Sequence, residues 1–362
     1  MYNLEILPRI YSVGAVNWNV RNFHGHTYTT QRGTTYNAYL IVDEKIALVD
    51  TVYGPFAGEL IENIGQIEII QGGSSSVWGS SLGGVVNVIT KDAGKTSVPH
   101  GSLTSAFGEF KTFKEAADIS GGSEKAGYFF SGSSLQTDGI LSQTDVKEKK
   151  GFGKAAIPLG DDLRLTGSFG YSGADVRYGV TRTNTINSQP YATRYGALQL
   201  QRDHDGGNFQ AAYKYNNQKI VTDIYNASTG LQTSSTISKD LYQGLSLNES
   251  FQWGNDYSSV IGADFEWHGI KSNKYLAKGE TVNMQAPYAN TTITIGSWDI
   301  IPGIRYDRNQ KFGSQTSPSL GTIYHFEDVH ESLIRARIAR VFNAPPLLWI
   351  VNNDPSQFVG PN

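Results

Sequence analysis

Apolar and polar residues alternate one by one along most of the chain, in runs of roughly 10 to 15 residues separated by polar turns. Strict alternation places one class of side chain on each face of a β-strand. The apolar positions of five such runs are Leu163, Leu165, Phe169 and Tyr171; Phe209, Ala211, Tyr213 and Tyr215; Leu245, Leu247, Phe251 and Trp253; Ile261, Ala263, Phe265 and Trp267; and Trp298, Ile300, Ile304 and Tyr306. The pattern predicts a mainly β protein with about 13 strands between Gly101 and Ala344.

The opposite face of these strands is polar throughout and carries charged residues such as Asp264 and Arg305. Aromatic residues recur toward the strand ends, as in the girdles of a membrane barrel. A soluble β-sandwich has shorter strands. No stretch approaches the ~18 to 20 apolar residues of a membrane-spanning helix. A bilayer would therefore be crossed by a closed barrel, in which all backbone polar groups are paired. We predict a partial antiparallel transmembrane β-barrel.

The first 64 residues follow a different pattern. A short strand is expected at Arg9–Val13, and Tyr39–Val42 with Ile46–Asp50 reads as a β-hairpin that turns at a charged triplet. Residues Pro55–Ile64 have apolar positions at helical spacing, and Pro55 suits a first helical turn. This part predicts a small α/β fragment.

Composition fits the β-rich prediction and narrows the chemistry. The 362 residues include 40 glycines and 20 tyrosines, only 17% are charged, and the net charge is −3. This charge gives no reason to expect a nucleic-acid partner. Because the chain has no cysteine, a disulfide framework, thiolate metal ligands and a cysteine nucleophile are excluded.

A continuous run from Gln66 to Lys91 carries the most specific motif of the chain. It is strand-prone at both ends and glycine- and serine-rich in the middle. The run resembles the end of the plug domain of TonB-dependent outer-membrane receptors. A phosphate-binding loop fits poorly, because the Lys-Ser/Thr ending is missing and a strand follows. The plug-motif residues are Glu68, Gly72, Gly73, Gly79, Gly83, Gly84, Asn87 and Lys91.

This resemblance implies active uptake of a siderophore-, cobalamin- or similar-sized ligand across the outer membrane. The expected partners are outer-membrane lipid, a TonB-type energy-coupling protein and a small-molecule ligand such as a metal chelate. No catalytic residue, metal site or cofactor is expected. Ligand-binding residues cannot be named from the pattern, although the stretches 178–193 and 271–286 are candidate loops at the barrel mouth. A passive barrel or adhesin is the weaker alternative because of the plug motif.

The histidines support no catalytic site at the level of sequence. They are scattered, and the sequence places none beside a convincing serine or carboxylate partner. The stretch from His325 to His330 reads as a polar turn between two strands. The histidines after residue 90 are His100, His204, His268, His325 and His330.

The first 64 residues resemble the opening of flavodiiron proteins, whose catalytic domain has the metallo-β-lactamase fold. The resemblance is carried by residues 11–16, 23–25, 32–41 and 47–52. It implies a place near a di-iron pocket for His24, His26 and Asp50, as remnants only. The His-x-Glu-x-Asp-His ligand stretch that should follow is missing, which disfavours the alternative of an oxygen- or nitric-oxide-reducing oxidoreductase.

The chain therefore divides into three expected parts: a flavodiiron-like fragment at 1–64, the end of a plug at 65–97 and part of a receptor barrel at 98–362. The two resemblances meet near residue 65 without a flexible linker. The first residues do not read as a signal peptide, and fewer strands are expected than the about 22 of such transporters. We expect a chimeric or truncated gene product, whose intact relative lies in the outer membrane.

Overall fold

The computed structural model divides the chain into two compact units, Met1–Glu62 and Asn63–Asn362. It describes the backbone of short strands between Leu4 and Val49, and residues 64–71, 77, 79, 84–273, 276–327 and 332–341. Every element in these described ranges of the chain is a β-strand.

The first unit contains the strands expected near its start. The predicted hairpin is present as β7 and β8, which pair antiparallel from Tyr39↔Val49 to Val42↔Ile46. The expected strand at residues 9–13 is β2, which joins them in a sheet of order β1-β2-β7-β8. Two smaller pairs, β3 with β6 and β4 with β5, complete the described part. Most of the predicted helix, residues 55–63, lies outside the described residues. The strands are β1 (Leu4–Leu7), β2 (Ile10–Ser12), β3 (Ala15–Asn17), β4 (Asn22–Phe23), β5 (Tyr28–Thr29), β6 (Thr34–Tyr36), β7 (Tyr39–Val42) and β8 (Ile46–Val49).

The second unit begins with an antiparallel pair, β9 (Ile64–Gln71) and β10 (Gly84–Thr90). Both strands are rich in Ile and Val, which suit a pleated surface. Their register places Glu68 opposite Asn87. The two strand-prone ends of the plug-like run therefore fold back on each other, and the chain leaves β10 toward the large sheet.

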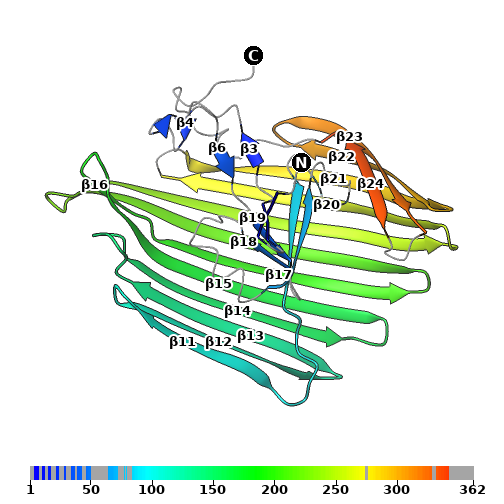
Figure 1. The fold of residues 1–362 in the computed structure, drawn as a ribbon, viewed down its shortest axis with the longest axis horizontal. Coiled ribbons are helices and arrows are strands. Elements are labelled where there is room, and N and C mark those ends of the chain that lie inside the picture. The colour runs from blue at the N-terminus through cyan, green and yellow to red at the C-terminus, as the bar shows by residue number, and fades with distance from the viewer. Residues whose placement is uncertain are drawn as a thin grey trace. The chain divides into compact units, whose positions relative to one another are not determined.

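Fourteen strands, β11 to β24, form one antiparallel sheet, one more strand than expected (Figure 1). Almost every strand pairs with its neighbours in sequence. The exception is the short β16, which pairs with the ends of β15 and β18. Strand β17 pairs with the remaining parts of β15 and β18. Such a meander follows from hairpin connections. The strands are β11 (His100–Gly108), β12 (Thr112–Ser123), β13 (Ala126–Thr137), β14 (Val146–Pro158), β15 (Leu163–Val180), β16 (Thr185–Ser188), β17 (Tyr191–His204), β18 (Gly207–Asn226), β19 (Gln232–Trp253), β20 (Tyr257–Ser272), β21 (Leu276–Ile295), β22 (Trp298–Asn309), β23 (Gly313–His325) and β24 (Leu333–Ala339).

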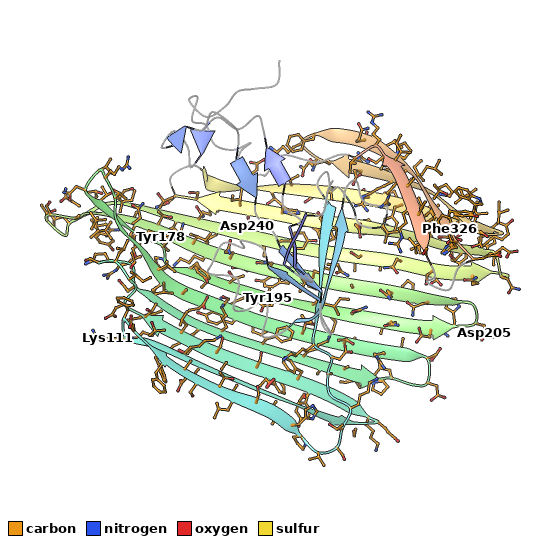
Figure 2. The ribbon with its side chains drawn as sticks, viewed as in Figure 1. Lys111, Tyr178, Tyr195, Asp205, Asp240 and Phe326 are labelled. Atoms are coloured by element: carbon orange, nitrogen blue, oxygen red, sulfur yellow. The ribbon has the colours of Figure 1, made fainter. Side chains whose placement is uncertain are left out.

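The strands are long, and the two ends of the sheet differ. Strand β19 has 22 residues, against about 9 to 11 for a strand that just crosses a bilayer. One end, here called the short-turn end, carries tight turns such as residues 205–206. The other, the long-loop end, carries residues 138–145 and the excursion through β16. Figure 2 labels Lys111 and Tyr178 at the long-loop end, and Asp205 and Phe326 at the short-turn end.

The two faces of the sheet have the opposite character to those of a soluble protein. On β22, burial alternates residue by residue: Ile304 is 51% exposed, whereas Arg305 is 3% and Asp307 1% exposed. We call the face of Ile304 the outer face and that of Arg305 the inner face. The predicted alternation is confirmed on this strand, and the exposed side is the apolar one.

The apolar outer face is continuous across neighbouring strands. One row runs through Leu198, Tyr213, Leu245 and Phe265, each directly opposite the next. Leu198 is 52% and Tyr213 39% exposed. Contiguous exposed apolar surface of this extent is rare in soluble monomers and marks contact with another apolar phase. Among the described residues, no helix is long and apolar enough to cross a membrane.

Candidate functional site: the inner wall and the plug-like hairpin

Among the described residues, the two most buried charged side chains, Arg305 and Asp307, lie on the inner face. Arg305 Nη1 donates to Asp264 Oδ2 at 2.7 Å and its Nε to Asp307 Oδ1 at 2.9 Å. The Arg305 and Asp307 side chains are only 3% and 1% exposed. The antiparallel register brings β20 and β22 to the two sides of β21, and so places residues 41 positions apart within reach. A guanidinium suits this arrangement, because its fixed fork can serve two carboxylates at once.

Aromatic and polar side chains surround this cluster. The Arg305 guanidinium lies 5.5 Å from the centre of the Tyr288 ring. Beside Asp264 on the same face of β20, Glu266 accepts from Tyr242 at 3.4 Å and lies 3.2 Å from His268. The inner wall is thus a connected polar surface with fixed positions, as expected of a face that meets water, a plug or a hydrophilic solute.

One turn of the plug-like run reaches this wall. Gly79 has φ +76°, a conformation that favours glycine. A Cβ at Gly79 would lie 3.8 Å from Nη2 of Arg305. Of the plug-motif residues, Glu68 and Asn87 are opposite each other and Gly84 starts β10. The remaining glycines of the motif, Gly72, Gly73 and Gly83, lie outside the described residues.

Lys91, the last motif residue, contacts the wall where the chain leaves β10. Its Nζ lies 3.7 Å from Asp118 on β12 and 5.6 Å from the centre of the Phe129 ring on β13. From β14, Lys154 reaches the same segment, with Nζ donating to Thr90 Oγ1 at 3.2 Å and to the Lys91 carbonyl at 3.1 Å. Lys91 at the end of the hairpin and Lys154 on the sheet therefore hold the segment after β10 against three strands of the sheet.

A seam of glycines continues this contact. The Gly94 amide donates to the Tyr128 carbonyl at 3.0 Å, and the Gly122 amide to the Thr96 carbonyl at 2.8 Å. A Cβ on either Gly122 or Gly127 would collide with the Gly94 carbonyl oxygen. The sequence prediction missed this seam and Lys154. The available signal was a glycine pair inside a strand, which marks close approach of another backbone.

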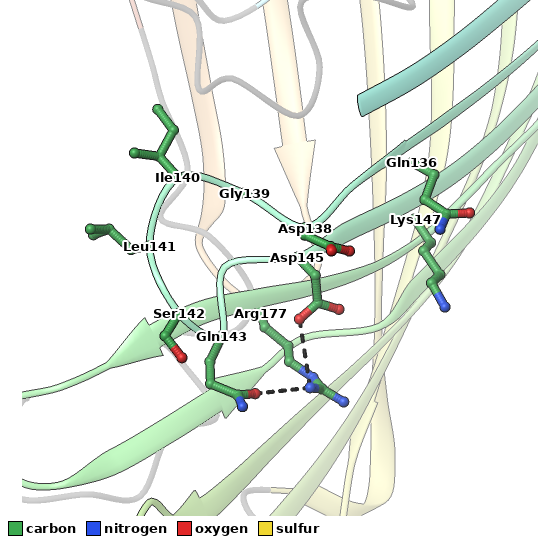
Figure 3. A pocket seen from close by; sticks show the side chains of 10 residues that line it. All are labelled: Gln136, Asp138, Gly139, Ile140, Leu141, Ser142, Gln143, Asp145, Lys147 and Arg177. Atoms are coloured by element: carbon green, nitrogen blue, oxygen red, sulfur yellow. Dashed lines mark hydrogen bonds and ion pairs between the residues drawn. The ribbon is translucent and has the colours of Figure 1, made fainter. Parts of the chain in front are cut away.

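A hollow of about 550 Å³ lies at the long-loop end, between the 138–145 loop and the adjoining strands. Arg177 Nη1 donates to the Gln143 side-chain oxygen at 2.9 Å and lies 3.6 Å from Asp145 Oδ1; Figure 3 draws both contacts as dashed lines. Gln136 and Lys147 of this hollow are opposite each other, and the strand alternation puts both on the outer face. The hollow therefore belongs to the outer rim and not to the inner wall.

The two candidate ligand loops differ from each other in the structure. Residues 178–193 form a true excursion, with the ends of β15 and β17 flanking β16. Residues 271–286 are mostly strand, because β21 begins at Leu276 and pairs with β20 from Ser272↔Leu276 onward. The prediction of a loop there was wrong: polar residues on one face of a long strand resemble a loop when the sequence is read without its partner.

The prediction that the histidines lack carboxylate partners was also wrong. His204 lies 2.5 Å from Glu249, His268 3.2 Å from Glu266 and His325 2.8 Å from Asp299. Two of these pairs join different strands, so only the register reveals them. His100 contacts the hydroxyls of Thr96 and Ser120 instead. Within the described residues, no histidine joins both a hydroxyl and a carboxylate, and no group of three potential ligands is placed to hold a metal ion. The remnant residues His24, His26 and Asp50 lie outside the described residues.

Comparison with known proteins shows which family most of the chain belongs to. The family described as "TonB dependent receptor-like, beta-barrel" matches residues 135–362. The chain belongs to the TonB-dependent receptor β-barrel family. This family consists of transporters, and membership indicates an outer-membrane location. Its proteins bind small-molecule ligands such as siderophores and work with TonB.

Solved structures support the same fold. The siderophore receptor PirA from Pseudomonas aeruginosa superposes with a TM-score of 0.64 at 21% identity, over 79% of this chain and 51% of that one. The copper transporter OprC superposes with a TM-score of 0.66 at 14% identity, over 80% and 52%. The chain thus spans about half the length of these two solved chains. At these identities the likeness shows the fold alone.

The beginning of the chain has different relatives. The nitric oxide reductase of Moorella thermoacetica is 68% identical over 65 residues, which are 18% of this chain and 16% of that protein. The N-terminal segment therefore matches flavodiiron proteins, as the sequence motifs indicated, and covers about a sixth of such a protein. The receptor family match and the flavodiiron match lie on different parts of the chain.

Proposed function

We propose that residues 65–362 are part of an outer-membrane receptor that takes up a siderophore, cobalamin or a metal chelate of similar size. The observation that carries this proposal is the inner wall with the plug-like hairpin against it. A polar wall with fixed charges can guide a hydrophilic solute past lipid, and a hairpin held by Lys91, Lys154 and hydrogen bonds can be moved without breaking the sheet. Solved relatives of this fold include receptors for siderophores and a copper transporter.

Ligand contact is expected on the inner face toward the long-loop end. There, Gln218 and Asp240 are directly opposite each other on β18 and β19, and the Gln218 amide donates to Thr193 Oγ1 at 3.2 Å. These side chains combine donors and acceptors within one patch, as solute recognition requires. The outer hollow near Arg177 is not part of this path.

A binding assay tests the receptor function. Membranes containing the full chain would be incubated with iron-55-labelled catecholate and hydroxamate siderophores and with cobalt-57-labelled cobalamin. We expect saturable binding of one ligand class and at least tenfold weaker binding in the Gln218→Ala/Asp240→Ala variant, about 1.4 kcal/mol. Leu241→Ala, on the outer face of the same strand, is the matched control. Binding that is absent for every class, or equal in both variants, would contradict the proposal.

The two sets of relatives support a second proposal, that the chain is a chimera joined near residue 65. Residues before this point follow the flavodiiron pattern, and residues after it follow the receptor pattern. Single genomic reads spanning codons 50 to 80 test it. Reads that cross the joint unbroken support one continuous gene. If no read crosses it, the two parts belong to separate genes and the chimera is excluded.

We propose that the chain is not an enzyme, although its first residues resemble one. In the flavodiiron pattern, the metal ligands follow the segment that this chain shares, and here the receptor pattern begins instead. The test is reduction of nitric oxide or oxygen by the purified full chain after loading with ferrous iron and flavin. Turnover above that of the free cofactors would contradict this proposal.

A further inference from the structure

Three lysines stand side by side on the outer face, on three adjacent strands. The register places Lys219 of β18 opposite Lys239 of β19, and Lys239 opposite Lys271 of β20. Neighbouring strands lie only about 5 Å apart. We call Lys219, Lys239 and Lys271 the lysine row. All three side chains are exposed.

The lysine row borders the apolar part of the outer face on its long-loop side. Lys271 is on the same face as Trp267, about 13 Å farther along the strand, by the usual rise of about 3.3 Å per residue. Lys219 is on the same face as Tyr213, about 20 Å farther along. No register shift interrupts these stretches, so the assignment to the outer face is secure. The row thus lies where an interfacial headgroup layer adjoins the apolar band.

Among the described residues, no carboxylate forms an ion pair with a lysine of this row. Ala192 on β17 lies beside Lys219, and the Gly279 backbone of β21 lies beside Lys271. The next carboxylate on the same face of β18 is Asp223, about 13 Å from Lys219 along the strand, and it accepts from Gln232 instead. Like charges directly opposite each other destabilise a sheet. The row therefore has a cost that an external anion would remove.

Further cations extend this surface along the same height. Lys149 of β14 connects to the row through Gly173 and Ala192, which are opposite each other. Arg194 lies two residues from Ala192 on the same face and is exposed. Cations therefore occur on five of the six adjacent strands from β14 to β20, with β16 aside, because β15 contributes Gly173 at this level of the outer face.

We propose that the lysine row binds the phosphate groups of lipid headgroups in the leaflet at the long-loop end. Ammonium groups on flexible stems can reach headgroups while their stems cover apolar surface, and they bind phosphate as point charges. A row open to the lipid side faces headgroups and not the solute path along the inner wall. This inference rests on the outer-membrane location of the family and is independent of the ligand that is taken up.

Titration of the full chain in zwitterionic detergent micelles with dioctanoyl phosphatidic acid tests this binding. Bound lipid is counted by native mass spectrometry. The variant Lys219→Gln/Lys239→Gln/Lys271→Gln should bind on the order of 100-fold more weakly, from the usual contribution of each lysine near an anionic surface. Binding should also weaken as salt rises, because the row is exposed. Dioctanoyl phosphatidylcholine, which has a phosphate but no net charge, should bind far less.

Matched variants make the result specific to the row. The charge-matched control Lys95→Gln/Lys125→Gln/Arg164→Gln removes three exposed cations away from the row and should bind as the original chain does. Lys219→Arg/Lys239→Arg/Lys271→Arg keeps the charge and should keep the binding. Equal binding by the row and control variants would overturn the proposal. So would displacement of the lipid by an equal concentration of inorganic phosphate, which would show a site for free phosphate.

Discussion

The outer and inner faces of the same sheet are stabilised in opposite ways. On the outer face, large apolar side chains such as Phe169 and Leu198 are more than half exposed. On the inner face, Arg305 and Asp307 are almost completely buried, and Arg305 Nε donates to Asp307 Oδ1. The comparison teaches that burial alone does not mark the stabilising core of this molecule. The outer face depends on its solvent being lipid, and the inner face depends on each charge keeping its partner.

The largest effect is expected from breaking the inner cluster. Arg305→Met leaves the carboxylates of the buried Asp307 and the half-buried Asp264 without their cation, which costs about 3 to 5 kcal/mol. Arg308→Met is the control, because Arg308 is exposed on the outer face of the same strand. Urea unfolding of the full chain in phospholipid bilayers measures both. An equal loss of unfolding free energy in the two variants would mean that a cation on the inner face contributes no more to stability than one on the outer face.

A charge placed on the outer face should have the next largest effect. Leu198→Arg puts a cation among Tyr213 and the neighbouring apolar side chains, at a cost of about 2 to 4 kcal/mol near the bilayer middle. Gln199→Arg, the adjacent residue on the inner face, should be tolerated. The amount of heat-modifiable, membrane-embedded chain on a gel reports the difference. A larger loss of membrane-embedded chain for Gln199→Arg than for Leu198→Arg would contradict the assignment of the outer face to lipid.

The contact between the hairpin and the wall should respond more modestly. Lys154→Met removes the hydrogen bonds to Thr90 and Lys91 and should cost about 1.5 to 3 kcal/mol, the range for bonds to a charged group. Lys214→Met, also on the inner face, is the control because its ammonium has no hydrogen-bond or ion-pair partner in the part of the chain that the structure describes. Hydrogen exchange of the β9–β10 backbone should accelerate in the first variant alone. Unchanged exchange there would show that Lys154 does not hold the hairpin.

The smallest effect is expected at a loop on neither face. Lys111 lies 2.8 Å from Asp138 with its side chain 83% exposed, and its hydrogen bond with this carboxylate raises the pKa of Lys111. A lysine whose pKa is raised on folding stabilises the fold at pH values below the ordinary lysine pKa of about 10.4. This stabilisation is lost as the pH rises through the pKa of the lysine in the folded protein. Since solvent screens the pair, Lys111→Ala should leave the melting temperature unchanged at pH 7. A clear drop there would show that this loop contact is less screened than its exposure indicates.

Much of the fold was predictable because strand alternation is a local property. The apolar faces named from the sequence, such as Ile300 and Ile304 on β22, are on the exposed outer face. The plug-like run also gave two strands whose ends differ from the structure by only a few residues. The loop expected at 271–286 failed because a long strand with one polar face carries no local mark that distinguishes it from a loop.

The candidate site was less predictable, since its contacts join distant positions. Lys91 was recognised as part of a motif, but its partner Asp118 and the neighbouring ring of Phe129 were not. The sequence analysis did not predict the pairs His204–Glu249 and His325–Asp299 for the same reason. Each of these contacts depends on which residue of one strand is opposite which residue of another. A one-residue change of register would move every side chain to the other face.

The sequence by itself determined the family motifs, the strand-rich architecture and, for the strands recognised from their alternation, the side of the sheet on which each residue lies. These follow from the two-residue period of a strand and from turns that are short along the chain. Only the tertiary structure decided which charges meet. Arg305 finds Asp264 across β21, and Lys219, Lys239 and Lys271 line up across three strands. The register of paired strands sets these neighbours, and register is a property of strands held together and not of any one of them.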